Sequence, residues 1–169
     1  FNNDIRRRRR RAKDLGIEVF ESSDIEKFYE LYQKNLDKKN TKILARQLKY
    51  NFKIVKNLYH CCEINSSVRM FFAELNGKPI AANFLVYDSN TVFYIMGWSD
   101  RDKKDLGGMD AVQFEAIKFA MQSGREFDFE GSMTESIEKY FRSFGAVQKQ
   151  FFKITKYNSK ILKLRNALI

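Results

Sequence analysis

The sequence has 169 residues, of which 44% are hydrophobic and 31% charged, a composition that suits one folded domain and excludes a disordered chain. The net charge is +10, and residues 1–60 carry most of it, with 16 Lys and Arg against 8 Asp and Glu. This balance favours polyanionic partners such as RNA, anionic lipid or phosphorylated metabolites. No apolar run approaches the ~20 residues of a membrane span. The adjacent Cys61 and Cys62 exclude a disulfide framework and favour a reducing, cytoplasmic compartment.

The opening of the chain predicts a short basic helix that contains Arg6 to Arg11 and stops at Gly16. This arginine run could bind RNA or anionic lipid head groups, be a solvated helix, or pack against an absent preceding half. Because no aromatic residue is interleaved with the arginines, a stacking platform for bases is not expected here.

The remaining elements follow from hydrophobic periodicity and turn residues. The sequence predicts a short strand after Gly16, two helices, a three-strand meander with a hairpin turn at Asn76-Gly77, and then alternating helices and strands. The later elements are expected at Asp110 to Gln122 (helix), Glu126 to Glu130 (strand), Glu135 to Phe144 (helix), Val147 to Thr155 (strand) and 158–169 (helix). The order β-α-α-β-β-β-α-β-α-β indicates a mixed α/β fold.

A glycine-rich segment between a strand and a helix is the first candidate site. Gly97 ends the third strand of the meander, and Gly107-Gly108 precede the helix from Asp110. Free N–H groups at a helix start, together with glycines that allow close approach, can hold a pyrophosphate. The alternative is that the two glycines only form a tight turn.

The element order resembles the GNAT acyltransferase fold, and most closely its Fem-type branch. The residues that carry the resemblance are the Arg-rich helix before Gly16-Ile17, Tyr94 to Gly97, Phe114 to Ile117, Phe127 to Ser132 and Ile137 to Gly145. The resemblance covers nearly the whole chain and implies one GNAT-like domain over 1–169, with a basic helix at 1–16, a core at 17–157 and a helix at 158–169. Fem-type proteins contain two GNAT-like halves, and this chain resembles the second. Its start at Phe1 rather than Met fits a missing N-terminal half.

The resemblance also implies where a donor would bind. GNAT proteins hold the CoA pyrophosphate through Gln/Arg-x-x-Gly-x-Gly/Ala, and Lys104 to Met109 matches only the basic start and the first glycine. Met109 replaces the last small residue, unless the frame shifts to Gly108-Met109-Asp110-Ala111. The implied donor contacts are Met96, Gly97, Trp98, Lys104, Gly107, Gly108, Met109 and Asp110, with backbone N–H groups near Gly97 stabilising the oxyanion.

Three residues are candidates for proton transfer. Asp128 and Glu130 alternate with Phe127 and Phe129, so in a strand the two carboxylates share one face and could accept a proton from an attacking amine. The alternative is that one of them pairs with Arg142 or caps the next helix. By resemblance, Tyr140 would protonate a leaving thiolate, although its apolar neighbours also suit a core tyrosine.

No metal site is expected. His60-Cys61-Cys62 is the one sequence that suggests one, but adjacent side chains cannot easily converge on a single ion, and the chain has no second histidine.

The resemblance therefore implies a bacterial acyltransferase that moves an acyl group from acyl-CoA to an amine, such as an amino sugar or a cell-envelope precursor. Two alternatives remain open. One is a Fem-type peptidoglycan-bridge aminoacyltransferase with aminoacyl-tRNA as donor, and the other is a non-catalytic module that binds RNA or an anionic membrane surface.

Overall fold

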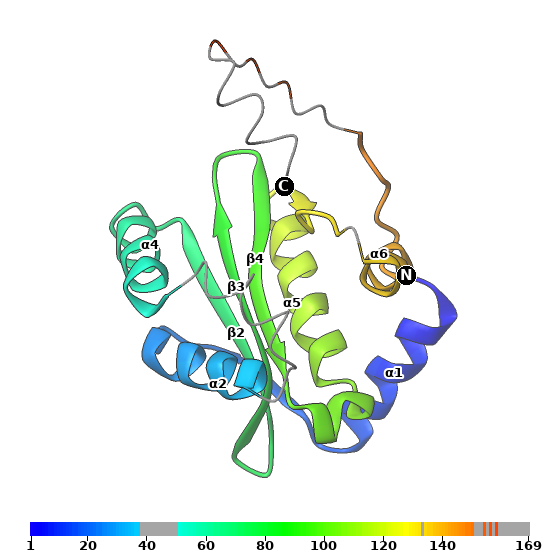
Figure 1. The fold of residues 1–169 in the computed structure, drawn as a ribbon. Coiled ribbons are helices and arrows are strands. Elements are labelled where there is room, and N and C mark those ends of the chain that lie inside the picture. Colours follow the sequence, from blue (N-terminus) through cyan, green and yellow to red (C-terminus); the bar gives the residue numbers. More distant parts are fainter. Residues whose placement is uncertain (38–50, 133, 151–153, 155, 157, 159–169) are drawn as a thin grey trace.

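The computed structural model describes residues 1–37, 51–132, 134–150, 154, 156 and 158 (Figure 1). Its elements in chain order are α1 (Asn3–Asp14), β1 (Glu18–Glu21), α2 (Ile25–Asp37), α4 (Phe52–Ile64), β2 (Val68–Leu75), β3 (Lys78–Tyr87), β4 (Thr91–Ser99), the 3-10 helix η1 (Arg101–Leu106), α5 (Gly108–Gln122), β5 (Glu126–Asp128) and α6 (Glu135–Ser143). The predicted mixed α/β fold class and the meander are confirmed.

The five strands form one sheet in the order β1-β2-β3-β4-β5. The first four strands pair antiparallel with their neighbours in the sheet. Only β5 runs parallel to its neighbour β4, since α5 crosses over between them. Asn76 and Gly77 both have positive φ, of 52° and 69°, as the hairpin turn between β2 and β3 requires.

Helices cover both faces of the sheet (Figure 1). One face packs against α2 and α4, with Phe28, Tyr59, Phe72 and Phe84 among the buried residues. The other packs against α5, whose Val112, Ala116 and Ala120 meet Leu85 and Val92. A third cluster joins α1 and α6 to the end of β5. The many phenylalanines therefore serve three contiguous apolar clusters rather than one.

The structure changes several predicted boundaries. The α1 helix is capped by the Asn2 side chain, which accepts from the Ile5 N–H at 2.9 Å, two residues before Asp4, the cap that the sequence offers. The α4 helix begins at Phe52 after the cap Asn51, whereas the hydrophobic spacing predicts a helix from about Thr41; residues 38–50 lie outside the described part.

At the C-terminal end, residues 147–150 of the predicted Val147 to Thr155 strand are described and are not in a strand. The remainder of that segment and the predicted helix over 158–169 lie almost entirely outside the described residues. Among the described helices, none is both long and apolar enough to cross a membrane.

Candidate active site

The edge of β4 that faces β5 is open over most of its length. Pairing between the two parallel strands runs only from Thr91↔Glu126 to Phe93↔Asp128, whereas β4 continues to Ser99. Beyond Phe93, no described strand pairs with this edge. Unpaired backbone N–H and C=O groups on a strand edge form a template for an extended ligand.

A β-bulge interrupts β4 at the start of this open edge. Leu85 faces Tyr94 and Phe84 faces Met96, so Ile95 is an extra residue on β4. A bulge re-aims the backbone locally and is common beside active sites. The bulge lies two residues before Gly97, the residue around which the resemblance implied the oxyanion contacts.

Gly97 is required for a different reason. A Cβ on Gly97 would lie 2.1 Å from the hydroxyl oxygen of Tyr94, so the phenol ring occupies the space of the missing side chain. Burial raises the pKa of Tyr94 to about 12, and Gln113 is its hydrogen-bonding neighbour. The close approach expected at Gly97 is therefore made by Tyr94, with no room shown for a ligand on that side.

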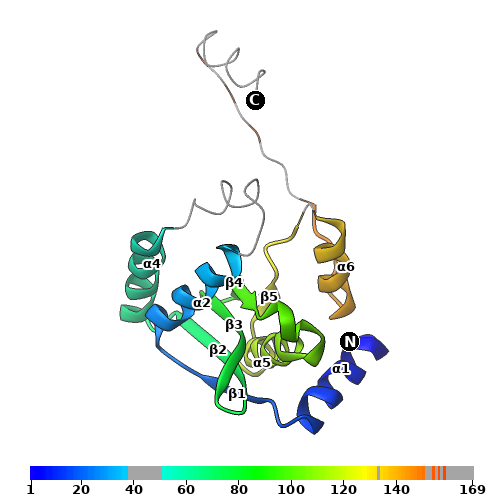
Figure 2. The ribbon, with the colours of Figure 1, turned by 60° about the horizontal axis from the view of Figure 1, so that its bottom comes forward.

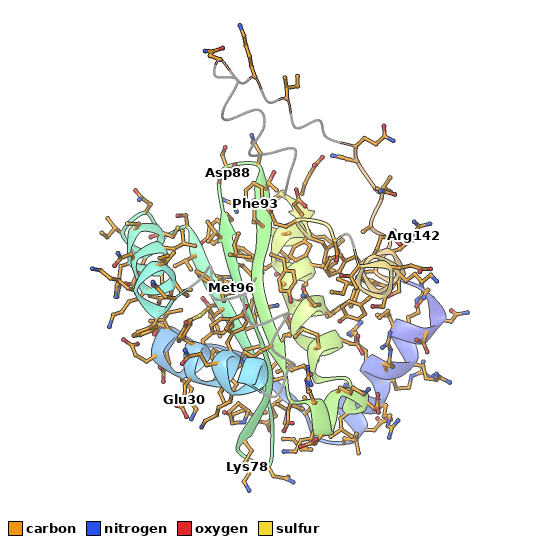
Figure 3. All side chains as sticks on the ribbon, in the orientation of Figure 1. Glu30, Lys78, Asp88, Phe93, Met96 and Arg142 are labelled. Carbon is orange, nitrogen blue, oxygen red and sulfur yellow. The ribbon has the colours of Figure 1, made fainter. Side chains whose placement is uncertain are left out.

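Met96 and Trp98 are only 6% and 4% exposed and pack in the cluster with α2 and α4. Figure 3 shows Met96 in the middle of the sheet, away from the chain termini. Because both side chains are buried, these two residues could contact a donor only through their backbone in β4.

The Gly107-Gly108 pair lies at the start of α5. Other parts of the protein occupy the space beside each glycine. Gly107 has a φ of +85°, and a Cβ on it would lie 2.8 Å from the carbonyl oxygen of Arg8 in α1. A Cβ on Gly108 would lie 2.8 Å from Cδ1 of Ile80 in β3. The glycines thus allow α1 and β3 to approach α5 closely, which favours the tight-turn interpretation. Lys104 in η1 is exposed, and Met109 is half-buried.

Asp110, Arg8 and Tyr140 meet where α5, α1 and α6 converge. Nε of Arg8 lies 3.4 Å from Oδ2 of Asp110, whose side chain is 4% exposed. The Tyr140 hydroxyl faces the same carboxylate, although in a geometry too poor for a regular hydrogen bond. Burial raises the pKa of Asp110 and, together with the Asp110 charge, raises the pKa of Tyr140 well above its ordinary value.

This cluster predicts a stability effect confined to one arginine of the run. Arg8→Met leaves the Asp110 carboxylate buried without its cation, and should lower the free energy of unfolding by about 1–3 kcal/mol. Arg7→Met is the matched control, because the Arg7 side chain is 81% exposed and pairs with Asp4 on the surface. Its cost should stay within about 0.5 kcal/mol. Urea unfolding of both variants measures the difference, and equal costs would show that Arg8 does not anchor α1.

Asp128 lies in the last pair of the β4–β5 ladder and Glu130 follows it, but the two residues do not share a strand face. The strand ends at Asp128, and Oδ1 of Asp128 accepts the Glu130 N–H at 2.7 Å. Glu130 then has a φ of +59° and Gly131 one of +71°, so the chain turns away. The predicted strand to Glu130 is therefore wrong by two residues, because the Asp128 side chain caps a turn.

Neither carboxylate is neutralised by Arg142. That arginine lies on the outer side of α6 (Figure 3), where Nε and Nη2 donate to Oε1 of Glu138 at 3.0 and 2.6 Å. Both Asp128 and Glu130 are exposed. Partial burial, and secondarily the Asp128 charge, raise the pKa of Glu130. An exposed carboxylate with a raised pKa is suited to take up a proton.

The remaining candidates stand apart from this region. His60 lies on α4, on the opposite face of the sheet, with Nδ1 3.3 Å from a Glu63 carboxylate oxygen. Within the described residues, no group of three or more His, Cys, Asp and Glu side chains could hold a metal ion. Sequence reasoning missed the buried contacts of Arg8, Tyr94 and Gln113. For Arg8 a signal existed, because it lies three residues after Ile5 and four before Ala12, on the buried face of α1.

A family model for the acetyltransferase (GNAT) domain matches residues 1–142. The chain belongs to the GNAT acetyltransferase family. None of the curated proteins is similar enough in sequence to count as a relative. The open edge of β4, the bulge at Ile95 and the crossover into α5 are thus parts of a GNAT acyltransferase domain.

Solved structures share this fold at low sequence identity. An aminoglycoside acetyltransferase, meta-AAC0020 from an uncultured soil metagenomic sample, in complex with sisomicin, is 12% identical with a TM-score of 0.60, and covers 85% of this chain and 97% of its own. The aminoglycoside N-acetyltransferase AAC(6')-Iy in complex with CoA is 10% identical with a TM-score of 0.62, over 85% and 95%. FemX is 13% identical with a TM-score of 0.66, over 86% of this chain and 54% of FemX.

Proposed function

We propose that this GNAT domain transfers an acyl group from an acyl-CoA donor to an amine on a small acceptor of the amino-sugar type. The observation that carries the proposal is the open edge of β4 from Tyr94 to Ser99, which begins at the Ile95 bulge. The amide-bearing arm of a CoA thioester can pair with such an edge as an added strand would. A similar fold holds CoA in AAC(6')-Iy, which supports this choice of donor.

The proposed reaction follows from the groups around this edge. The amine nitrogen attacks the thioester carbonyl carbon, a backbone N–H at the bulge stabilises the oxyanion, and the C–S bond then breaks. Glu130, which follows the point where β4 and β5 part, accepts the proton that the amine loses. The thiolate leaves and takes up a proton from solvent, since Tyr140 faces Asp110 and its pKa is raised.

The finer assignment is to the Fem-type branch, with this chain corresponding to the second of two GNAT-like halves. The match to about half of FemX supports this. In such a protein the donor could instead be an aminoacyl-tRNA and the acceptor a cell-envelope precursor, within a bacterial cytoplasm. The ester donor has the same reacting carbonyl, so the chemistry at Glu130 is unchanged. The two donors differ in the part of the donor molecule that would lie along β4, which is the CoA arm in one case and the tRNA end in the other.

Acetyl-CoA binding tests the donor assignment. Calorimetric titration should show binding, and Lys104→Ala should weaken it by about tenfold, because an exposed cation near the start of α5 can meet the donor phosphates. Lys53→Ala is the matched control: Lys53 is also exposed, but lies on α4 across the sheet. Equal affinities in the two variants would place the phosphates away from Lys104. Absence of acetyl-CoA binding, with transfer from an aminoacyl-tRNA, would make the ester the donor.

A further inference from the structure

A basic groove runs between α1 and α5, on the β1 side of α5. It has a volume of about 560 Å³, and four cationic side chains of α1 line it, namely Arg6, Arg9, Arg10 and Lys13. Its other walls come from Ala111 and Phe114 of α5 and from residues of the β1 segment. In Figure 2, α1 lies along the start of α5, beside β1 and away from the β4–β5 junction. None of the residues that line the groove belongs to β4 or to η1, so it shares no residue with the open strand edge or with Lys104.

The arginine run divides into three faces of one helix. Ile5 and Ala12 are buried and Arg8 reaches Asp110, so this face holds α1 to α5. A second face points into the groove. Arg7 and Arg11, four residues apart, are exposed and do not line the groove.

The charge of the groove is not compensated. The one acid that lines it, Glu115, is paired with Lys118 at 2.9 Å. Within the described residues, no carboxylate lies within ion-pair distance of Arg6, Arg10 or Lys13. At 1.5 Å rise per residue, these three cations follow one another about 6 and about 4.5 Å along the helix axis. A row of unpaired cations at such intervals suits a linear polyanion.

Aromatic rings stand beside these cations, although none is interleaved with them in the sequence. The Arg9 guanidinium carbon lies 3.2 Å from the centroid of the Phe114 ring. The Phe1 ring lies next to Phe114, with centroids 5.6 Å apart and an interplanar angle of 54°. The rings that the sequence of this helix lacks are supplied beside it by α5 and by residue 1.

We propose that this groove binds a strand of single-stranded nucleic acid. A cationic groove that follows the phosphates, with aromatic or guanidinium surfaces on which bases stack, is the combination that such strands require. A lipid surface fits less well: a bilayer is flat, and it would use the outward Arg7 and Arg11 more than a recessed groove. The proposal does not depend on the transferase reaction, because it concerns binding alone.

The experiment is a fluorescence-anisotropy titration of the full 169-residue chain with a labelled oligouridylate. The double substitution Arg6→Gln with Arg10→Gln removes two groove cations, and should weaken binding by roughly tenfold and lower the salt slope by about 1.4. The matched control, Arg7→Gln with Arg11→Gln, removes the same charge from the outward face and should change the affinity by less than about threefold. Melting temperatures show that both variants are folded.

A third variant tests the stacking surface. Phe114→Leu keeps an apolar side chain in place and removes the ring, so the oligouridylate affinity should fall by about fivefold without a change in salt slope. Equal weakening by the two arginine pairs would overturn the proposal, since it would show a diffuse charge effect. Failure of the parent chain to bind the strand, while it binds anionic phosphatidylserine vesicles, would also overturn it in favour of a membrane surface.

Discussion

Gly107→Ala is expected to lower the melting temperature by roughly 5–15 °C. Two costs add at this position. Its φ of +85° is unfavourable for any residue with a Cβ, which costs about 1–2 kcal/mol. The new methyl group would also stand 2.8 Å from the Arg8 carbonyl oxygen, which belongs to the backbone of α1 and cannot rotate away. Either α1 moves off α5 or the whole domain loses stability.

Gly124→Ala separates the two costs. Gly124 follows the other end of α5 with a φ of +68°, and a Cβ there would meet nothing within 4 Å. Its melting temperature should fall by only about 2–8 °C, from the φ alone. The difference between the variants, measured by thermal denaturation followed by circular dichroism, is the cost of displacing α1. If Gly107→Ala melts like Gly124→Ala, then α1 does not close on this turn, and Gly107 is free to meet a phosphate.

The same geometry changes what Gly108→Val can report. A valine at Gly108 would test a donor-phosphate contact only if it left the stability of the fold unchanged. Ile80 is 1% exposed and lies within 3.0 Å of the added Cβ, so the variant should be destabilised whatever the donor does. Lys104→Ala is the cleaner test, because the exposed side chain carries no packing.

The sequence predicted the helices and strands better than it predicted which of their atoms remain available to a ligand. Periodicity and the Asn76-Gly77 turn suffice for the β2–β3–β4 meander, since each strand needs only its own pattern and its neighbour. The boundary at Asp128 was missed because a side-chain cap, which no periodicity reports, ends the strand. The role of Gly97 was missed because Tyr94 reaches it from within the same strand across the bulge.

Long-range packing explains the remaining differences at the site. Gly107 and Asp110 sit where a GNAT pyrophosphate loop is expected, yet their partners in this chain come from α1, about a hundred residues earlier. No local pattern could join Arg8 to Asp110, or Phe114 to Arg9. The arginine run therefore looked like one feature in the sequence, and the fold divides it into an anchoring face, a groove face and an outward face.

Glu130→Gln should lower turnover by about 10²–10⁴ while the donor affinity stays nearly unchanged. The amide keeps the shape of the side chain but cannot accept the amine proton. Acyl transfer to one amine acceptor, measured by steady-state kinetics at saturating donor, gives the rate, and thermal denaturation of the same preparation gives the folded fraction. An unaltered rate per folded molecule, with a lower melting temperature, would assign Glu130 to the turn instead of the chemistry.

The pH dependence makes the test specific to a base at this position. Burial and the Asp128 charge raise the pKa of Glu130, so the base form, and with it the rate, is lost as the pH falls through that raised value. Asp128→Asn keeps an oxygen to accept the Glu130 N–H but removes the negative charge, so the pKa of Glu130 falls. With the same acceptor, the acidic limb of the rate profile should therefore move to lower pH in Asp128→Asn and disappear in Glu130→Gln. A limb that stays in place in both variants belongs to the acceptor amine or to another group, and Glu130 is then not the base.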